Sequence, residues 1–177
     1  RLHEGGGGSV AGPSKEKKGY GGDPVFARSR FKSVAQTLKE VPVVSAALGP
    51  VAGLPASRFV GSHFRIMVKD NAQILVAGPA VVSRAFGTDF TKEELGGSDV
   101  HKKNGVTDNI AESEEDAFNQ IKKFLSFFPA NIYELPPKKD SKDETDRSEK
   151  ILEEIIPKDR KKTYEMREII KMVVDDK

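Results

Sequence analysis

Residues 41–86 read VPVVSAALGPVAGLPASRFVGSHFRIMVKDNAQILVAGPAVVSRAF, and this stretch decides the fold class. It holds three apolar runs, each with the length and composition of a buried strand. These runs are residues 41–47, 64–68 and 73–77. We expect Gly49–Gly53 to break the first strand and Leu54-Pro55 to open a short helix, because proline suits a first helical turn. Pro79 then begins a helix that runs to about Phe86. Short strands that alternate with helices predict an α/β layered domain.

The flanking segments carry clear helix signals. Apolar residues predict a helix over 26–38. Thr91 and Glu94 have the spacing of a capping box, and Ser113 with Asp116 opens the clearest helix in the chain. The expected apolar face of that last helix is Phe118, Ile121, Leu125 and Phe128, and Pro129 ends it. A further strand is expected within 105–111.

The last forty residues differ in composition from the rest. Residues 136–150 are mixed Lys, Asp, Glu and Ser with no apolar residue after Pro137, which predicts a solvated linker. A short helix follows around 151–156, and Thr163 is expected to cap a final helix with an apolar stripe. We therefore divide the chain into residues 1–135, a charged linker with a short helix at 136–162, and the beginning of another domain at 163–177.

Composition excludes several classes of protein. The chain has no cysteine, which rules out disulfides and thiolate metal sites, and its three histidines lie far apart, so no metal site is expected. No run is long enough to cross a membrane. Residues 1–88 hold 12 Lys and Arg against 5 Asp and Glu, whereas 89–177 hold 17 against 22. This asymmetry favours an anionic partner such as a phosphorylated cofactor for the basic half. Nucleic acid is not expected, because no recognised module is present.

No side-chain catalytic constellation stands out. Ser45 or Ser62 could act with His63 or His101, but neither serine lies in a nucleophile elbow. We interpret His101 as a structural residue rather than a general base.

Backbone donors are the stronger signal. Gly5–Gly8 and Gly49–Gly53 both let peptide N–H groups approach a ligand, and the second precedes a helix N-terminus, where negative charge is favoured. Two such loops could form an oxyanion hole for a thioester enolate. Four glycines and a serine are also typical of a flexible linker, so the spacing alone leaves both interpretations open.

Several segments, in the same order along the chain, resemble the carboxyltransferase β subunits of biotin-dependent acyl-CoA carboxylases, the propionyl-CoA and methylcrotonyl-CoA carboxylase family. They are the strand end with an acidic residue and glycines at 1–8, Gly-Pro-x-Ala-Gly at 49–53, Met-Val-x-Asp at 67–70, Gly-Pro-x-Val-Val at 78–82, Glu93–His101 with Gly105–Asp108, and Tyr164–Ile170. The stretch Glu93–His101 with Gly105–Asp108 is the most specific of these.

The resemblance implies a crotonase-like (ClpP/crotonase) α/β spiral of ββα units. It implies an enzyme that moves CO2 from carboxybiotin to the α- or γ-carbon of an acyl-CoA. The catalytic groups it implies are the backbone N–H groups of Gly6 and Gly7, which would form the oxyanion hole. The substrate-binding residues it implies are Ala52, Gly53, Gly96 and Gly97. Arg28, Arg30, Lys32 and Arg58 are alternatives for contacts with coenzyme A phosphates.

The same resemblance implies biotin as cofactor, carried on a partner biotin carboxylase or biotin carrier subunit, and a homo-oligomer of carboxyltransferase subunits. It places the protein in the mitochondrial matrix or the bacterial cytoplasm. Leu54-Pro55 and Ser9 depart from the family pattern beside the expected pocket. The family's C-terminal domain and the first part of its N-terminal domain are missing, so we expect this chain by itself to be inactive. A biotin-dependent decarboxylase, another crotonase-fold acyl-CoA enzyme and a non-catalytic interaction module are the alternatives.

Overall fold

The computed structural model describes residues 1–5, 30–138, 140, 144 and 146–174. The chain forms two compact units, Arg1–Glu134 and Leu135–Lys177. The strands of the first unit are β1 (Leu2–Gly5), β2 (Val44–Ala52), β3 (Phe64–Val68), β4 (Gln73–Leu75) and β5 (Asn109–Ala111). Its helices are α1 (Arg30–Glu40), α2 (Leu54–Val60), α3 (Pro79–Phe86), α4 (Lys92–Gly96), α5 (Ser98–Asn104) and α6 (Glu114–Leu125). The second unit holds α7 (Leu152–Ile155) and α8 (Met166–Val173).

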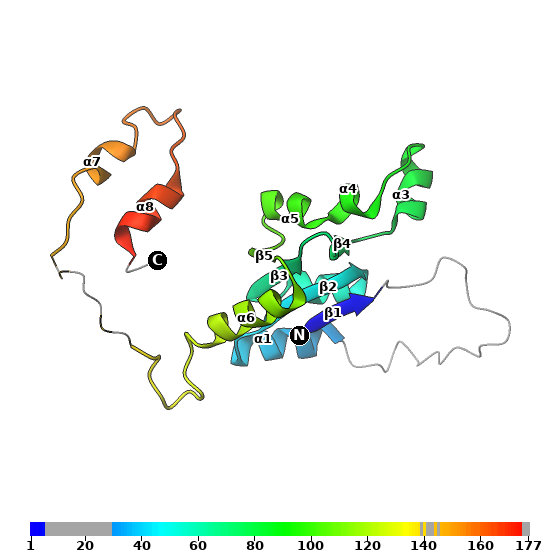
Figure 1. Cartoon of the computed structure of the whole chain (residues 1–177), viewed down its shortest axis with the longest axis horizontal. Helices are drawn as coiled ribbons and strands as arrows, with labels where there is room; N and C mark the ends of the chain where they lie inside the picture. Colours follow the sequence, from blue (N-terminus) through cyan, green and yellow to red (C-terminus); the bar gives the residue numbers. More distant parts are fainter. Residues whose placement is uncertain (6–29, 139, 141–143, 145, 175–177) are drawn as a thin grey trace. The chain divides into compact units, whose positions relative to one another are not determined.

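The first unit is built on one parallel sheet in the order β1-β2-β3-β5, with β4 also paired to β2 (Figure 1). β2 is the central strand, and seven of its nine residues are buried. Parallel strands need crossover connections, and α2 supplies one between β2 and β3. The α/β class predicted for this segment is therefore confirmed.

The expectation that Gly49–Gly53 breaks the first strand was wrong, because β2 continues through this segment to Ala52. The strand exchanges partners there: Val44–Ala47 pair with β3, and Pro50–Ala52 pair with β4. At the exchange point the side-chain amide of Asn71 donates to the carbonyl of Leu48. The missing N–H of Pro50 therefore falls where the ladder is already interrupted, the position at which a strand tolerates proline best.

Helices α2 and α6 lie on opposite faces of the sheet. Ser45 bonds to Ser62 just beyond the end of α2, whereas its neighbour Val44 lines a small cavity with residues of α6. Phe64, which pairs with Val44 in the sheet, stacks on Phe124 of α6 with ring centroids 4.5 Å apart. Successive residues of a strand point to opposite faces, so these contacts place one helix on each side.

The core follows from this layering. It consists of β-strand side chains with residues of α2 and α6. The fully buried hydrophobic members are Ala46, Ala47, Val51, Phe59, Ile66, Met67, Ala72, Ala111 and Ala117. On α6, Phe124 packs against this cluster although it was missing from the predicted apolar face. Leu125, the last residue of α6, is 45% exposed, and Phe128, which lies beyond the helix, is 40% exposed. The helix begins at the predicted cap but ends at Leu125, before the expected Phe128, and of the predicted face Ile121 packs against the core whereas Leu125 does not.

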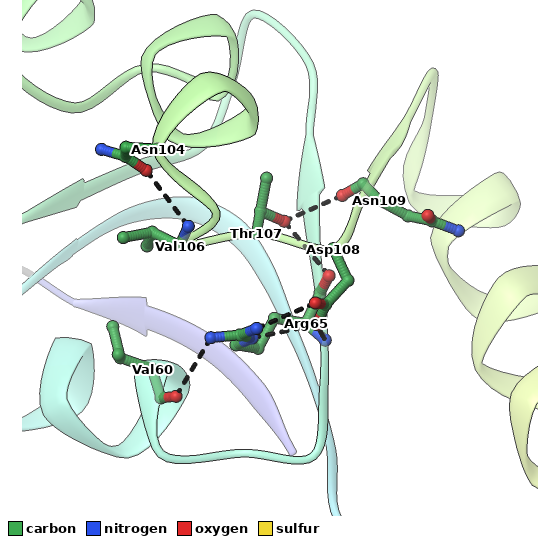
Figure 2. A network of polar contacts seen from close by, with 7 residues as sticks. All are labelled: Val60, Arg65, Asn104, Val106, Thr107, Asp108 and Asn109. Atoms are coloured by element: carbon green, nitrogen blue, oxygen red, sulfur yellow. Dashed lines mark hydrogen bonds and ion pairs between the residues drawn. The ribbon is translucent and has the colours of Figure 1, made fainter. Parts of the chain in front are cut away.

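A polar network attaches the edge strand β5 to β3 (Figure 2). The guanidinium of Arg65 donates to both carboxylate oxygens of Asp108, at 2.9 and 2.8 Å, and the backbone N–H of Arg65 donates to the same carboxylate at 2.8 Å. Thr107 lies with its hydroxyl 3.1 Å from the Arg65 carbonyl and 2.9 Å from that of Asn109. The Thr107 hydroxyl and the Asp108 carboxylate therefore both fasten the start of β5 to Arg65 of β3.

Most local predictions agree with the structure. Residues 64–68 and 79–86 form the expected strand and helix, and α4 carries the full Thr91–Glu94 capping box. The strand expected within 105–111 is limited to Asn109–Ala111. Helix α5 was not predicted.

The second unit contains two short helices. The N-cap of α8 is Glu165, whose side chain accepts from the N–H of Arg167, and not Thr163 as predicted. Arg147 donates to the carbonyl of Met172 at 2.7 Å, at the C-terminal end of α8. Several apolar side chains of this unit are exposed, including Met166 and Ile170 at 48% and 49%. None of the helices in the described residues has the length and apolar character needed to cross a membrane.

Candidate functional site

Two of the predicted glycine segments meet at the carboxyl edge of the sheet. Gly5 ends β1 and is paired with Val51 near the end of β2, while Gly53 directly follows β2. Gly5 has φ 151° and Gly53 has φ 68°, conformations that residues with side chains rarely adopt. Gly6 and Gly7, the predicted oxyanion-hole residues, lie outside the described residues. Their sequence positions directly follow Gly5.

Glu4 lies at the same edge, over β2. A Cβ at Gly49 would come within 3.1 Å of Glu4 Cγ and 3.2 Å of its Oε1. Gly49 therefore provides the space in which the Glu4 side chain crosses the central strand. This places a carboxylate one residue before the glycine loop.

Ala52 and Gly53 join the central strand to α2. Ala52 is buried and pairs with Leu75 of β4, and the N–H of Gly53 donates to the Leu75 carbonyl at 3.2 Å. No side chain caps α2, and Pro55 in its first turn has no N–H. The Gly53 N–H is therefore occupied by its bond to β4. A backbone donor to a ligand at the start of α2 would have to be an N–H later in the first turn of that helix.

Gly96 packs directly on β4. A Cβ at this position would lie 2.1 Å from the Ile74 carbonyl oxygen and 2.8 Å from a methyl of Leu75. Only glycine permits this approach of α4 to the strand. Because Leu75 also accepts from Gly53, Gly53 and Gly96 both contact this strand residue.

Gly97 and its neighbours form a polar clamp on the start of β4. Gly97 bridges Gln73 in antiparallel fashion, and the Gln73 Nε2 donates to Glu93 at 2.8 Å. A Cβ at Gly97 would lie 2.2 Å from Glu93 Oε1. The structure therefore brings Ala52, Gly53, Gly96 and Gly97 to β4 from two sides.

His101 stabilises this arrangement from α5. Its Nε2 lies 2.8 Å from the Ile74 carbonyl, and since a carbonyl only accepts, Nε2 carries the proton. Its Nδ1 then accepts from Asn104 at 3.3 Å. With both ring nitrogens bonded and the side chain buried, His101 has the structural role expected for it.

The serine–histidine pairs considered from the sequence do not form. Ser45 is fully buried and bonds to His3 Nε2 at 3.0 Å and to Ser62 at 2.7 Å. His63 Nδ1 instead accepts from the N–H of Val43 at 3.0 Å. A buried serine cannot attack a substrate, so this network fastens β1, β2 and α2 to one another.

The sequence did not predict that His3 bonds to Ser45. The only signal was its position in a short strand. Burial, together with smaller effects of nearby positive charges that include Arg1 and Arg58, lowers the pKa of His3 to about 4. The imidazole is therefore neutral near pH 7.

A cavity of about 580 Å³ lies beside β1, between α1 and α2. It is lined by Arg1, Leu2, His3, Glu4, Ser33, Val34, Thr37, Pro55 and Arg58. Its volume is within the usual range for small-molecule sites. The sequence did not predict the part played by α1, because Ser33 and Thr37 carry no motif. Across the described residues, no group of three or more acidic, histidine or cysteine side chains is arranged to hold a metal ion.

Comparison with known proteins identifies the relatives of this chain. The carboxyl transferase domain family matches residues 17–177. The propionyl-CoA carboxylase carboxyltransferase subunit of Haloferax mediterranei is 34% identical over 147 residues, 82% of this chain and 28% of that protein. The methylmalonyl-CoA decarboxylase subunit alpha of Veillonella parvula is 34% identical over 137 residues, 77% of this chain and 27% of that protein.

A solved structure gives the same result. The crystal structure of transcarboxylase 12S, a hexamer with hydrolysed methylmalonyl-coenzyme A bound, matches with a TM-score of 0.66 and 32% identity, over 82% of this chain and 29% of that one. The likeness confirms the predicted crotonase-like α/β fold class. The chain spans less than a third of the length of each of these relatives.

Proposed function

This chain belongs to the carboxyl transferase family, and we propose that it is part of the carboxyltransferase component of a biotin-dependent acyl-CoA carboxylase. The complete enzyme would move CO2 from carboxybiotin to the α- or γ-carbon of an acyl-CoA. Its relatives include a propionyl-CoA carboxylase subunit and a transcarboxylase with a coenzyme A ligand bound. The observation that supports the assignment most directly is that Gly5 and Gly53, both in positive-φ conformations, lie at the same edge of the sheet: Gly5 pairs with Val51, and Gly53 follows the end of β2.

In the proposed mechanism the backbone of Gly6 and Gly7 donates to the thioester oxygen of the acyl-CoA. Negative charge develops on that oxygen as the enolate forms, and fixed peptide donors stabilise it without an ionisable side chain. Ala52 and Gly53 would shape one wall of the pocket, and Gly96 and Gly97 another, since all four pack on β4. Carboxybiotin would supply the CO2 that the α-carbon attacks.

The proposed partners follow from the relatives. Biotin would be carried by a biotin carboxylase or biotin carrier subunit, and the 12S hexamer supports a homo-oligomer of carboxyltransferase subunits. The mitochondrial matrix or the bacterial cytoplasm is the proposed location; one relative, 33% identical, is the mitochondrial propionyl-CoA carboxylase beta chain of Homo sapiens.

A decarboxylase is the second candidate function, because the Veillonella parvula subunit is as similar in sequence as the carboxylase subunit, at 34% identity. Both reactions pass through the same thioester enolate, so the pocket described above serves either. Assay of the complete enzyme in both directions would distinguish them.

The oxyanion assignment can be tested at Gly7 in the complete enzyme. Gly7→Pro removes one N–H donor and restricts φ. Loss of one such donor typically lowers kcat by about 10²–10³. Ser9→Ala is the control, since it removes no proposed donor and should change kcat far less than tenfold. A Gly7→Pro enzyme that melts like the parent and retains its kcat would refute the assignment.

A further inference from the structure

The short strand β4 carries a polar side chain beside two apolar ones. Gln73 is 8% exposed, and the buried residues Ile74 and Leu75 follow it. The Oε1 of Gln73 is buried and, among the described residues, has no hydrogen-bond partner. A buried acceptor without a donor is unfavourable, so a leucine of similar size would serve the stability of the sheet at least as well. Stability alone therefore does not account for glutamine at this position.

The other end of the Gln73 amide makes a directional contact with α4. Its Nε2 donates to Glu93 Oε2 at 2.8 Å, and a hydrogen bond to a charged acceptor is stronger than one between neutral groups. Of the five residues of α4, Gly96 is the one that is buried, so packing by itself holds this helix weakly. The bond between Gln73 and Glu93 therefore helps to fix where α4 lies on the strand.

Glu93 transmits this constraint to Gly97. The N–H of Gly97 donates to the Glu93 carbonyl at 2.9 Å, and a Cβ at Gly97 would lie 2.2 Å from Glu93 Oε1. One carboxylate oxygen of Glu93 thus lies against Gly97 while the other accepts from Gln73. Gly97 in turn forms a backbone bridge with Gln73. The three residues form a closed ring of contacts at Gly97, which ends α4 and precedes α5.

Strand β4 connects this ring of contacts to the glycine that follows β2. The strand has three residues, with Gln73 at its start and Leu75 at its end. The Leu75 carbonyl accepts from the N–H of Gly53 at 3.2 Å. A displacement of so short a strand at Gln73 therefore reaches Gly53 as well, and the relative position of the two glycine segments depends on the bond to Glu93.

We propose that Gln73 and Glu93 are positioning residues for acyl-CoA binding. Their bond holds Gly96 and Gly97 at the distance from Gly53 that the substrate requires, and neither side chain has to touch the substrate. The inference rests on the proposed function, in which these glycines form the walls of the acyl-CoA pocket. An effect of this kind is large enough to measure, because a misplacement of about 1 Å in a binding site can reduce the rate by about a hundredfold.

The test uses the complete enzyme and four variants. Gln73→Leu removes the amide together with its unpaired oxygen, and Glu93→Ala removes the acceptor. Glu93→Gln is the conservative variant, since it keeps an oxygen that accepts from Gln73. The control is Glu94→Gln, which changes the next carboxylate of α4 and retains the capping box, because glutamine also serves at that position. Steady-state kinetics are measured with propionyl-CoA, and with methylmalonyl-CoA for the decarboxylase direction, and folding by thermal melt.

The positioning role predicts a change in substrate binding without a loss of stability. Gln73→Leu and Glu93→Ala should each raise the KM for the acyl-CoA by about tenfold. Gln73→Leu should melt at the temperature of the parent or above it, because it removes a buried unpaired oxygen. Glu93→Gln should stay within about threefold of the parental KM, since it keeps the bond. Glu94→Gln should match the parent.

Other outcomes overturn the inference. A parental KM in both Gln73→Leu and Glu93→Ala would show that the bond does not position the pocket. A lower kcat at unchanged KM, together with a lower melting temperature, would show that the bond only stabilises the fold. If Gln73→Leu does not fold, Glu93→Ala decides, because Glu93 is exposed and its replacement leaves the core intact. These results would leave the proposed function in place, whereas a parent enzyme that turns over neither substrate would refute that function itself.

Discussion

Replacing Gly96 by alanine should separate α4 from β4. The new Cβ would stand 2.1 Å from the Ile74 carbonyl oxygen, where real Cβ contacts are never shorter than 3.0 Å. The obstructing atom is backbone, so no rotamer change relieves the overlap, and the helix must move by about 1 Å. Such movement would also disturb the bond from His101 Nε2 to the same carbonyl. Overpacking of this kind costs about 1–3 kcal/mol of unfolding free energy.

The control is Gly78→Ala. Gly78 has φ −72° and nothing within 4 Å of an added Cβ, so alanine fits without strain. By urea unfolding, Gly96→Ala should lose about 2–3 kcal/mol, which corresponds to a melting temperature lower by about 5–10 °C. Gly78→Ala should stay within about 0.5 kcal/mol of the parent. Equal stability of the two variants would show that α4 does not pack on β4 as described.

Three further predictions follow from other contacts. The unfolding free energy should fall by up to about 3 kcal/mol as the pH drops from 6.5 to 4, because the native pKa of His3 is about 4 and the unfolded chain binds the proton more readily. Urea titrations should show a smaller fall in the His3→Gln variant, and an identical fall would exclude His3 as the cause. A double-mutant cycle of Arg65→Ala and Asp108→Ala should give a coupling of about 1–2 kcal/mol, since the pair is bidentate and only 20% and 32% exposed; a coupling near zero would contradict the geometry. The purified 177-residue chain should not carboxylate any acyl-CoA from carboxybiotin, and turnover in an assay supplied with radiolabelled carboxybiotin would contradict this expectation.

Elements whose signals are local could be predicted from the sequence. The capping box of Thr91 and Glu94 forms as expected, and the side chain of Ser113 accepts from the N–H of Asp116 at 3.1 Å. In both cases the cap and its partner lie within four residues, so no tertiary information is needed. The α/β class was also predictable, since short apolar runs that alternate with helix signals are typical of a layered α/β domain.

Elements that depend on distant partners could not be predicted. Gly49-Pro50 reads locally as a strand break, yet β2 continues because β4 takes over the pairing and Asn71 bonds to the Leu48 carbonyl. Helix α5 begins at Ser98 directly after the two glycines, and its position is set by His101 on Ile74. These contacts join residues more than twenty positions apart, and no local propensity encodes them.

At the candidate site, local signals and distant contacts both act on one residue, Gly53. The sequence indicated correctly that Gly53 precedes a helix, and the structure adds that its φ is positive. It could not indicate that the Gly53 N–H is already bonded to the Leu75 carbonyl, at 3.2 Å. The Gly53 N–H therefore has a structural role in the sheet. Its positive φ allows the turn that carries the chain from β2 into α2. We therefore expect a substitution at Gly53 to act on the proposed pocket through the backbone of β4, and not through loss of a ligand contact.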